Sequence, residues 1–185
     1  MTNIKPFILS TWSFAPVGAD AAFPALAKGG GALDAVVHAA TVIEDDPTID
    51  SVGVGGLPDA DGKVSLDACV MTDPGRAGAV CFVRHYANVA QIARRVMEKT
   101  IHITLAGKGA EDFADHEGFE RRDLLTPGAK QVWEQWRNDP SAIDRDRYKG
   151  WLPPRNVEEL RPAVRAAQPQ RVPEPHHDTV GILAM

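Results

Sequence analysis

The feature that most restricts the fold of this chain is a proline-rich stretch between its body and its last residues. Seven of the 14 prolines lie between Asn138 and Pro175, interleaved with arginines, and the few apolar residues there show no sustained period. Such a stretch buries too little apolar surface to offset the entropy lost on ordering. We therefore expect a folded region at 1–137, a mobile linker at 138–175, and a cleavage site followed by a short strand at 176–185.

Composition and charge exclude several classes of protein. The 185 residues carry a net charge of −5 with both signs mixed, which argues against the basic face that nucleic-acid binding needs. No apolar run approaches the roughly 18 residues of a membrane span, and no signal peptide is visible. We therefore expect a cytoplasmic protein that binds neither nucleic acid nor membranes. Cys69 and Cys81 are expected to be buried as small apolar side chains.

The spacing of apolar residues predicts helices and strands before the proline-rich stretch. Helical patterns mark 20–28, 33–43, 87–99 and 109–116, and β-type patterns mark 7–12, 64–70, 79–83 and 101–105. In the second helix, Leu33, Val37 and Ile43 fall on one face, which predicts a single buried side. Residues 179–185 begin a further strand with no partner after it. The order of these elements indicates an α+β protein.

The segment that points most directly to a reaction is HDTVG at 177–181. It places a threonine between a polar stretch and an apolar strand. Cleavage between Asp178 and Thr179 would make Thr179 a chain end, whose hydroxyl is the nucleophile and whose α-amine is the base. Asp178 is placed to orient or deprotonate that hydroxyl during cleavage. The pattern therefore favours a self-processing hydrolase.

Two other patterns have plainer interpretations. Residues 51–58 are rich in glycine but lack the Gly-Lys-Ser/Thr ending of a phosphate-binding loop, so a tight structural loop is favoured. His176, His177 and Asp178 are adjacent, and neighbouring side chains on an extended chain point to opposite faces. We therefore expect no metal site there.

Four segments taken together resemble the glycosylasparaginases, within the isoaspartyl peptidase and plant-type asparaginase group of N-terminal-nucleophile hydrolases. The segments are STWSF at 10–14, KGGGALDAV at 28–36, DSVGVGGLPD at 50–59 and HDTVG at 177–181. A helix of the same family is similar to AQIARRVMEKT at 90–100. Order and spacing agree from about residue 7 to residue 185. The resemblance is to the N-terminal, or α, part of those enzymes.

This resemblance implies a fold and a reaction. The fold is an αββα four-layer sandwich, of which this chain forms the N-terminal half and is therefore incomplete. The reaction is hydrolysis of the amide between N-acetylglucosamine and the asparagine side chain, after autocleavage between Asp178 and Thr179. No metal or organic cofactor takes part. The working unit is a dimer of α/β pairs, so the implied partners are the β part of the same precursor and a second pair.

The resemblance also assigns residues. Thr179 is the processed nucleophile, and Asp178 is left at the end of the α part. Trp12 matches the tryptophan that packs beside the nucleophile, and Ser51 matches a serine of the substrate pocket. The groups that stabilise the oxyanion and hold the substrate belong to the β part. Since one oxyanion donor is worth about 2.7–4 kcal/mol, we expect this chain alone to be inactive, and aggregation-prone through unpaired sheet edges.

Two alternatives stay open. The first is an isoaspartyl peptidase or L-asparaginase of the same fold, although the His-Asp-Thr form of the cleavage site favours glycosylasparaginase. The second is a non-catalytic remnant or fragment, which acts, if at all, by pairing with a separately made β part.

Overall fold

The computed structural model describes residues 5–138 and 179–185. Residues 5–133 and 179–185 belong to one compact unit, although about 45 positions separate its two segments in the sequence. Its elements are β1 (Ile8–Ser10), α1 (Pro16–Ala27), α2 (Ala32–Glu44), β2 (Leu66–Asp73), β3 (Arg76–Val83), α3 (Val89–Lys99), β4 (Thr104–Ala106), α4 (Gly107–His116), the start of α5 (Pro127–Asn138) and β5 (Ile182–Ala184). The mixed arrangement of helices and strands predicted from the sequence is confirmed, whereas the four-layer sandwich stays a prediction.

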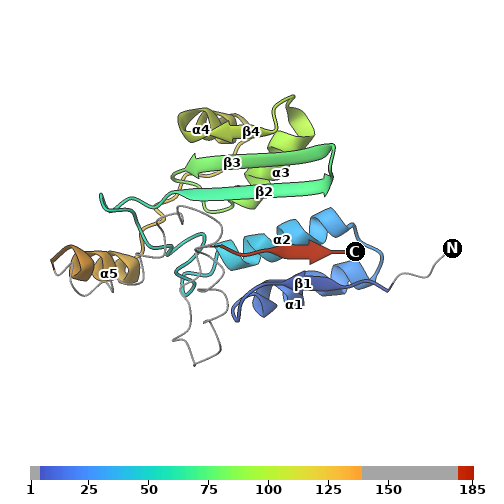
Figure 1. The fold of residues 1–185 in the computed structure, drawn as a ribbon, viewed down its shortest axis with the longest axis horizontal. Helices are drawn as coiled ribbons and strands as arrows, with labels where there is room; N and C mark the ends of the chain where they lie inside the picture. Colours follow the sequence, from blue (N-terminus) through green and yellow to red (C-terminus); the bar gives the residue numbers. More distant parts are fainter. Residues whose placement is uncertain (1–4, 139–178) are drawn as a thin grey trace, which may run out of the picture. The chain divides into compact units, whose positions relative to one another are not determined.

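The first sheet joins the two ends of the described chain. β1 and β5 pair antiparallel, with Ile8 opposite Ala184 and Ser10 opposite Ile182 (Figure 1). The N–H of Met185 donates to the carbonyl oxygen of Phe7 at 3.1 Å, so pairing continues past the strand end. The strand in 179–185, which has no partner strand after it in the sequence, therefore pairs with a strand near the other end of the chain.

The second sheet has the order β2-β3-β4. β2 and β3 form an antiparallel hairpin in which Ala68 lies opposite Val80, and β4 pairs parallel to β3. The turn closes where the side chain of Asp73 accepts a hydrogen bond from the N–H of Gly75 at 2.9 Å, an Asx-type turn. The sequence predicted a longer fourth strand from 101. Instead β4 covers three residues, and Ile103 is exposed.

Helices α1 and α2 form one packed pair. Pro16 begins α1, where its missing N–H is harmless, and Gly29 ends the helix with a φ of +91°. A side chain at Gly18 would overlap the carbonyl oxygen of Ala39, so glycine permits the close approach of the two helices. Together with Ile8 and other β1 and β5 residues, they bury one face of the first sheet.

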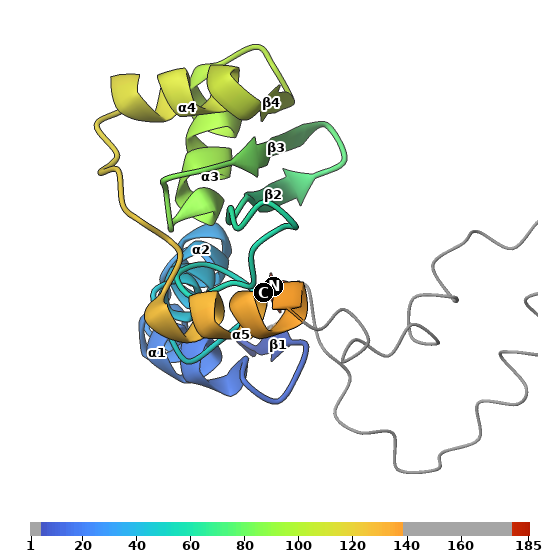
Figure 2. The same ribbon diagram turned by 90° about the vertical axis from the view of Figure 1, so that its left-hand side faces the viewer.

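Helices α3 and α4 cover one face of the second sheet. The apolar side of α3, including Ile92 and Val96, packs on Val70 and Val80 in the largest core cluster. In Figure 2, α3 lies beside β2 and β3 on the same side on which α1 and α2 lie beside β1. The opposite sheet faces are open: Leu9 and Leu183 are exposed, and so are both cysteines. The expectation of buried cysteines was wrong because alternate residues of β2 and β3 point away from the helices.

Helix α2 is buried on two sides rather than the single side predicted. Ala35 and Ala39 pack toward α1 and the first sheet, whereas Val37 joins the core under the second sheet. The side-chain amide Nε2 of Gln91 on α3 donates a hydrogen bond to Oγ1 of Thr41 on α2 at 3.0 Å. This bond links the pair α1 and α2 to the pair α3 and α4. The structure describes no helix long and apolar enough to cross a membrane. The proposed linker, 138–175, lies outside the described residues apart from its first position.

Candidate active site

Thr179 lies just before β5 and lines a cavity of about 830 Å³. The backbone two residues after Thr179 is held by Thr11, which follows β1: the N–H of Gly181 donates to Oγ1 of Thr11 at 2.9 Å, and the N–H of Thr11 donates to the carbonyl oxygen of Gly181 at 3.0 Å. The side chain of Thr179 is accessible, and the neighbouring Val180 packs into a small apolar cluster with Ile43. A hydroxyl on a fixed backbone beside a cavity is a suitable nucleophile.

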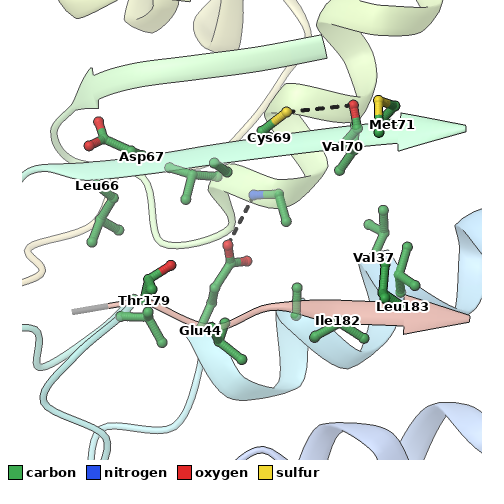
Figure 3. Close-up of a pocket in the computed structure, with 18 of the residues that line it drawn as sticks. Val37, Glu44, Leu66, Asp67, Cys69, Val70, Met71, Thr179, Ile182 and Leu183 are labelled. Atoms are coloured by element: carbon green, nitrogen blue, oxygen red, sulfur yellow. Dashed lines mark hydrogen bonds between the residues drawn. The ribbon is translucent and has the colours of Figure 1, made fainter. Parts of the chain in front are cut away.

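The cavity lies between β5 and β2 (Figure 3). Helix α2 contributes Val36, Val37 and Glu44, and the start of α3 contributes Val89 and Ala90. Residues of β2 line the opposite wall, and Ser51, Val52 and Gly53 of the glycine-rich loop complete the lining. The site is therefore mostly apolar with a few polar groups, as small-molecule sites usually are.

The glycine-rich loop closes tightly on the end of α2. Gly53 has a φ of +65°, and a side chain there would overlap the carbonyl oxygen of Glu44. The same carbonyl accepts the N–H of Val54 at 2.8 Å. Ser51, at the start of this loop, also lines the cavity, and its hydroxyl donates to Oδ1 of Asp50 at 3.4 Å. The loop thus brings Ser51 to the same cavity as Thr179.

Trp12 follows β1 with a φ of +74°, an uncommon conformation for a residue with a side chain. It is adjacent to Thr11, whose hydroxyl holds Gly181. Trp12 is 42% exposed and is not one of the residues that line the cavity. The structure therefore places Thr179 and Ser51 on the lining of the same cavity, and Trp12 next to Thr11, which holds Gly181. Asp178 lies outside the described residues.

Glu44 is the site residue that the sequence reasoning missed. Its side chain is buried, with 5% exposed, and it lines the cavity. Oε1 accepts the N–H of Ala90 in the first turn of α3 at 3.0 Å (Figure 3). Oε2 has no hydrogen-bond partner among the residues that the structure describes. A signal was present, since Glu44 follows Val37 by seven residues and so extends the apolar stripe of α2.

Burial governs the charge of this carboxyl group. Removal from water raises the pKa of Glu44 to about 8, the hydrogen bond from Ala90 opposes that rise, and the negative charge of Asp45 adds to it. The Asn88 amide also lowers this pKa, although its Nδ2 completes no hydrogen bond. Glu44 is therefore largely neutral at pH 7. Within the described ranges, no cluster of three or more His, Cys, Asp or Glu side chains could hold a metal ion.

Comparison with known proteins identifies the family. The profile of the family described as Asparaginase matches residues 11–185, which include Thr179, Ser51 and Trp12. This chain belongs to the asparaginase family. The family predicted from the four sequence segments is therefore confirmed.

Individual relatives agree with this assignment. The chain is 40% identical over 184 residues to an N(4)-(beta-N-acetylglucosaminyl)-L-asparaginase of Elizabethkingia miricola, covering all of this chain and 46% of the relative. It is 34% identical over 189 residues to the enzyme of the same name from Mus musculus, covering 97% of this chain and 54% of the relative. A plant-type L-asparaginase of Thermococcus kodakarensis is 41% identical over 125 residues, or 67% of this chain and 40% of the relative. The chain spans about half the length of the curated relatives it matches.

Proposed function

We propose that this chain is the α part of a glycosylasparaginase-type amidohydrolase whose nucleophile is Thr179. The observation that carries the proposal is that Thr179 lines a cavity that Ser51 also lines, two residues before Gly181, which Thr11 holds by hydrogen bonds. Two relatives that match nearly all of the chain are named as enzymes that act on N(4)-(beta-N-acetylglucosaminyl)-L-asparagine.

The chemistry has two stages. In the first, Oγ1 of Thr179 attacks the carbonyl carbon of Asp178, and the peptide C–N bond breaks as the hydroxyl proton passes to the nitrogen, which frees the α-amine of Thr179. Water then hydrolyses the resulting ester, which releases the carboxylate of Asp178 and restores the hydroxyl of Thr179. In the second, the α-amine takes the proton of the hydroxyl as Oγ attacks the side-chain amide carbonyl of the substrate, and then passes that proton to the departing amine. Water hydrolyses the acyl-enzyme and releases aspartate.

The remaining parts of the site belong to the β part. In this proposal it supplies the oxyanion donors and the groups that hold the substrate's α-carboxylate and α-amine, and two α/β pairs form the working dimer. Ser51 contributes to the substrate pocket, and Trp12 supports the backbone next to the nucleophile. The 185-residue chain alone is therefore inactive. L-asparagine hydrolysis is the second candidate, because the match to the Thermococcus asparaginase has 41% identity.

The test uses a polypeptide that joins residues 1–185 to the β part of the Elizabethkingia relative. Intact mass is expected to show a break before Thr179 in the wild type, and Thr179→Ala should abolish it. Thr48→Ala is the matched control, because Thr48 is exposed and lies away from the cavity. If Thr179→Ala still processes at that bond, the assignment of the nucleophile is wrong. Turnover of glycosylated asparagine, L-asparagine and an isoaspartyl dipeptide by the processed protein then identifies the substrate.

A further inference from the structure

One irregular segment between α4 and α5 contacts several separate parts of the fold. Residues 119–126 follow Gly118, whose φ is +81°, and end at Thr126, whose Oγ1 accepts the N–H of Ala129 in the first turn of α5. In Figure 2 this segment runs from α4 past α2 to α5. We call it the strap. Leu124 of the strap is buried in the largest core cluster, so the strap is packed against the fold although it has no regular secondary structure.

Arg122 ties the strap to two other elements. Its N–H donates to the carbonyl oxygen of His85, between β3 and α3, at 2.6 Å. Its Nη1 donates to Oδ1 of Asp45, the residue that follows α2, at 2.8 Å. Asp45 is next to Glu44, whose carbonyl oxygen accepts the N–H of Val54 in the glycine-rich loop. Arg122 therefore joins the strap to the end of α2, on which the glycine-rich loop closes.

The strap also bonds directly to the glycine-rich loop. The N–H of Gly55 donates to the carbonyl oxygen of Leu124 at 3.0 Å. Gly55 has a φ of +96°, and a side chain there would meet the carbonyl oxygen of Pro47 at 2.8 Å and Cγ2 of Thr126 at 3.4 Å. At this point the loop therefore lies tightly between the strap and the segment that follows α2.

The two sides of the candidate active site depend on different supports. Ser51 begins the loop that the strap holds, and the N–H of Leu57 donates to the carbonyl oxygen of Asp50 at 3.0 Å, which closes this loop around Ser51. The backbone after Thr179 is held instead by Thr11 and by the pairing of β5 with β1. A change in the strap should therefore displace Ser51 and leave the backbone after Thr179 in place.

We propose that Arg122 is a positioning residue for the substrate pocket: it holds the strap on the end of α2, and the strap fixes the glycine-rich loop and with it Ser51. The inference rests on the proposed function, in which Ser51 contributes to the substrate pocket and Thr179 is the nucleophile. Arg122 is not one of the residues that line the cavity, so it acts through the loop. It sets the affinity for the substrate rather than the rate of self-cleavage.

The neighbouring Arg121 provides a matched control. Both arginines lie on the strap, with 48% of the Arg121 side chain and 43% of the Arg122 side chain exposed. The guanidinium of Arg121 donates to both carboxylate oxygens of Asp115 on α4, at 3.0 and 2.7 Å, and lies over the ring of Tyr86. These contacts fix the start of the strap to α4, whereas Arg122 and Leu124 hold the part that contacts the glycine-rich loop. Loss of Arg121 should therefore leave Ser51 in place.

Amide hydrogen exchange tests the positioning without requiring activity. In Arg122→Ala, the amides of Val54 and Gly55 should exchange about threefold faster than in the wild type, the size expected from one exposed ion pair. Arg122→Lys keeps a positive charge opposite Asp45, so its exchange should stay within about twofold of the wild type. The same holds for Arg121→Ala, and slow exchange of α3 amides shows that each variant is folded.

Two samples make this measurement independent of cleavage. One is the 185-residue chain, and the other is the polypeptide that joins residues 1–185 to the β part of the Elizabethkingia relative and carries Thr179→Ala, which prevents processing. If Arg122→Ala and Arg121→Ala show the same exchange at Val54 and Gly55 in both samples, the proposal is wrong.

Steady-state kinetics of the joined polypeptide test the consequence for the substrate. The substrate is glycosylated asparagine or L-asparagine, whichever the wild type hydrolyses faster. In Arg122→Ala the KM should rise about threefold, whereas kcat and the rate of cleavage before Thr179 should stay within about twofold. Arg122→Lys should return the KM close to that of the wild type. Asp45→Asn should raise the KM as Arg122→Ala does, and the double variant should be no worse than either, because both changes remove the same ion pair.

The outcomes separate this proposal from the proposed function. If the wild-type joined polypeptide neither processes nor hydrolyses either substrate, the proposed function fails, and hydrogen exchange still decides whether Arg122 holds the loop. If processed Arg122→Ala has the wild-type KM, or if only its cleavage before Thr179 slows, the positioning role is refuted. An equal rise in the KM of Arg121→Ala refutes it as well, because a general loosening of the strap would then explain the effect.

Discussion

The neutral carboxyl of Glu44 makes the stability of the free chain depend on pH in a direction opposite to that of most acidic groups. Burial raises the pKa of Glu44 from 4.5 to about 8 in the folded chain. Between these two values the folded state keeps the proton, whereas the unfolded state releases it. Rising pH therefore stabilises the unfolded state relative to the folded state, and the free energy of unfolding falls.

The magnitude follows from the size of that shift. One unit of pKa difference corresponds to about 1.4 kcal/mol, so the slope is about 1.4 kcal/mol per pH unit and the whole effect is at most about 5 kcal/mol. It is fully developed above about pH 8 and absent below about pH 4.5. Glu44→Gln carries no titrating group and keeps an acceptor for the N–H of Ala90, so it should remove this slope.

The assay is urea unfolding of the 185-residue chain and its variants from pH 4.5 to pH 8.5, followed by circular dichroism. The free energy of unfolding of Glu44→Gln minus that of the wild type should rise across this range. Glu98→Gln should retain the wild-type slope, because that side chain makes an exposed ion pair with Arg94. A pH-independent difference between Glu44→Gln and the wild type would refute the argument that burial keeps this carboxyl neutral.

Three further substitutions test the supports of the site. Gly53→Ala should lower the free energy of unfolding by about 2 kcal/mol or more, because Gly53 has a positive φ and a side chain there would overlap the end of α2. Gly109→Ala is its control, since a Cβ added at Gly109 meets no atom within 4 Å. Tyr86→Phe should lower it by about 1 kcal/mol through loss of the hydroxyl's hydrogen bonds to α4, and equal urea midpoints would contradict this. Thr11→Val should slow the cleavage before Thr179 in the polypeptide that joins residues 1–185 to the β part, because the N–H of Gly181 loses the Thr11 hydroxyl as its acceptor. If intact mass shows the same cleavage kinetics as the wild type, Thr11 has no role in positioning the cleavage site.

Local patterns in the sequence were sufficient for much of the fold. The apolar stripe of α3 predicted its buried face, with Ile92 and Val96 in the core. The glycines after α1 marked its end, and Gly29 has the expected positive φ. These features depend on neighbours within about one helical turn, so the information lies within a few positions. The motif segments, in their order, were likewise sufficient for the family.

The errors fall where distant parts of the chain decide. Alternation at 101–105 predicted a buried strand, yet Ile101 and Ile103 are exposed because only three residues pair with β3. Cys69 and Cys81 lie on the sheet face away from α3 and α4, so their apolar character did not bury them. Sequence spacing shows which residues share a face of a strand, but not which face another element covers.

The sequence by itself determined the family, the nucleophile as a candidate and most of the helices. Only the tertiary structure decided that the strand after Thr179 pairs with β1, that Ser51 reaches the same cavity, and that Glu44 is buried, with no hydrogen-bond partner for Oε2 in the described part of the chain. The physical reason is that a strand pairing or the pKa of a carboxyl depends on groups brought together by folding. The hydrogen-bond donor to Glu44, for example, is the N–H of Ala90, which lies 46 positions away in the chain.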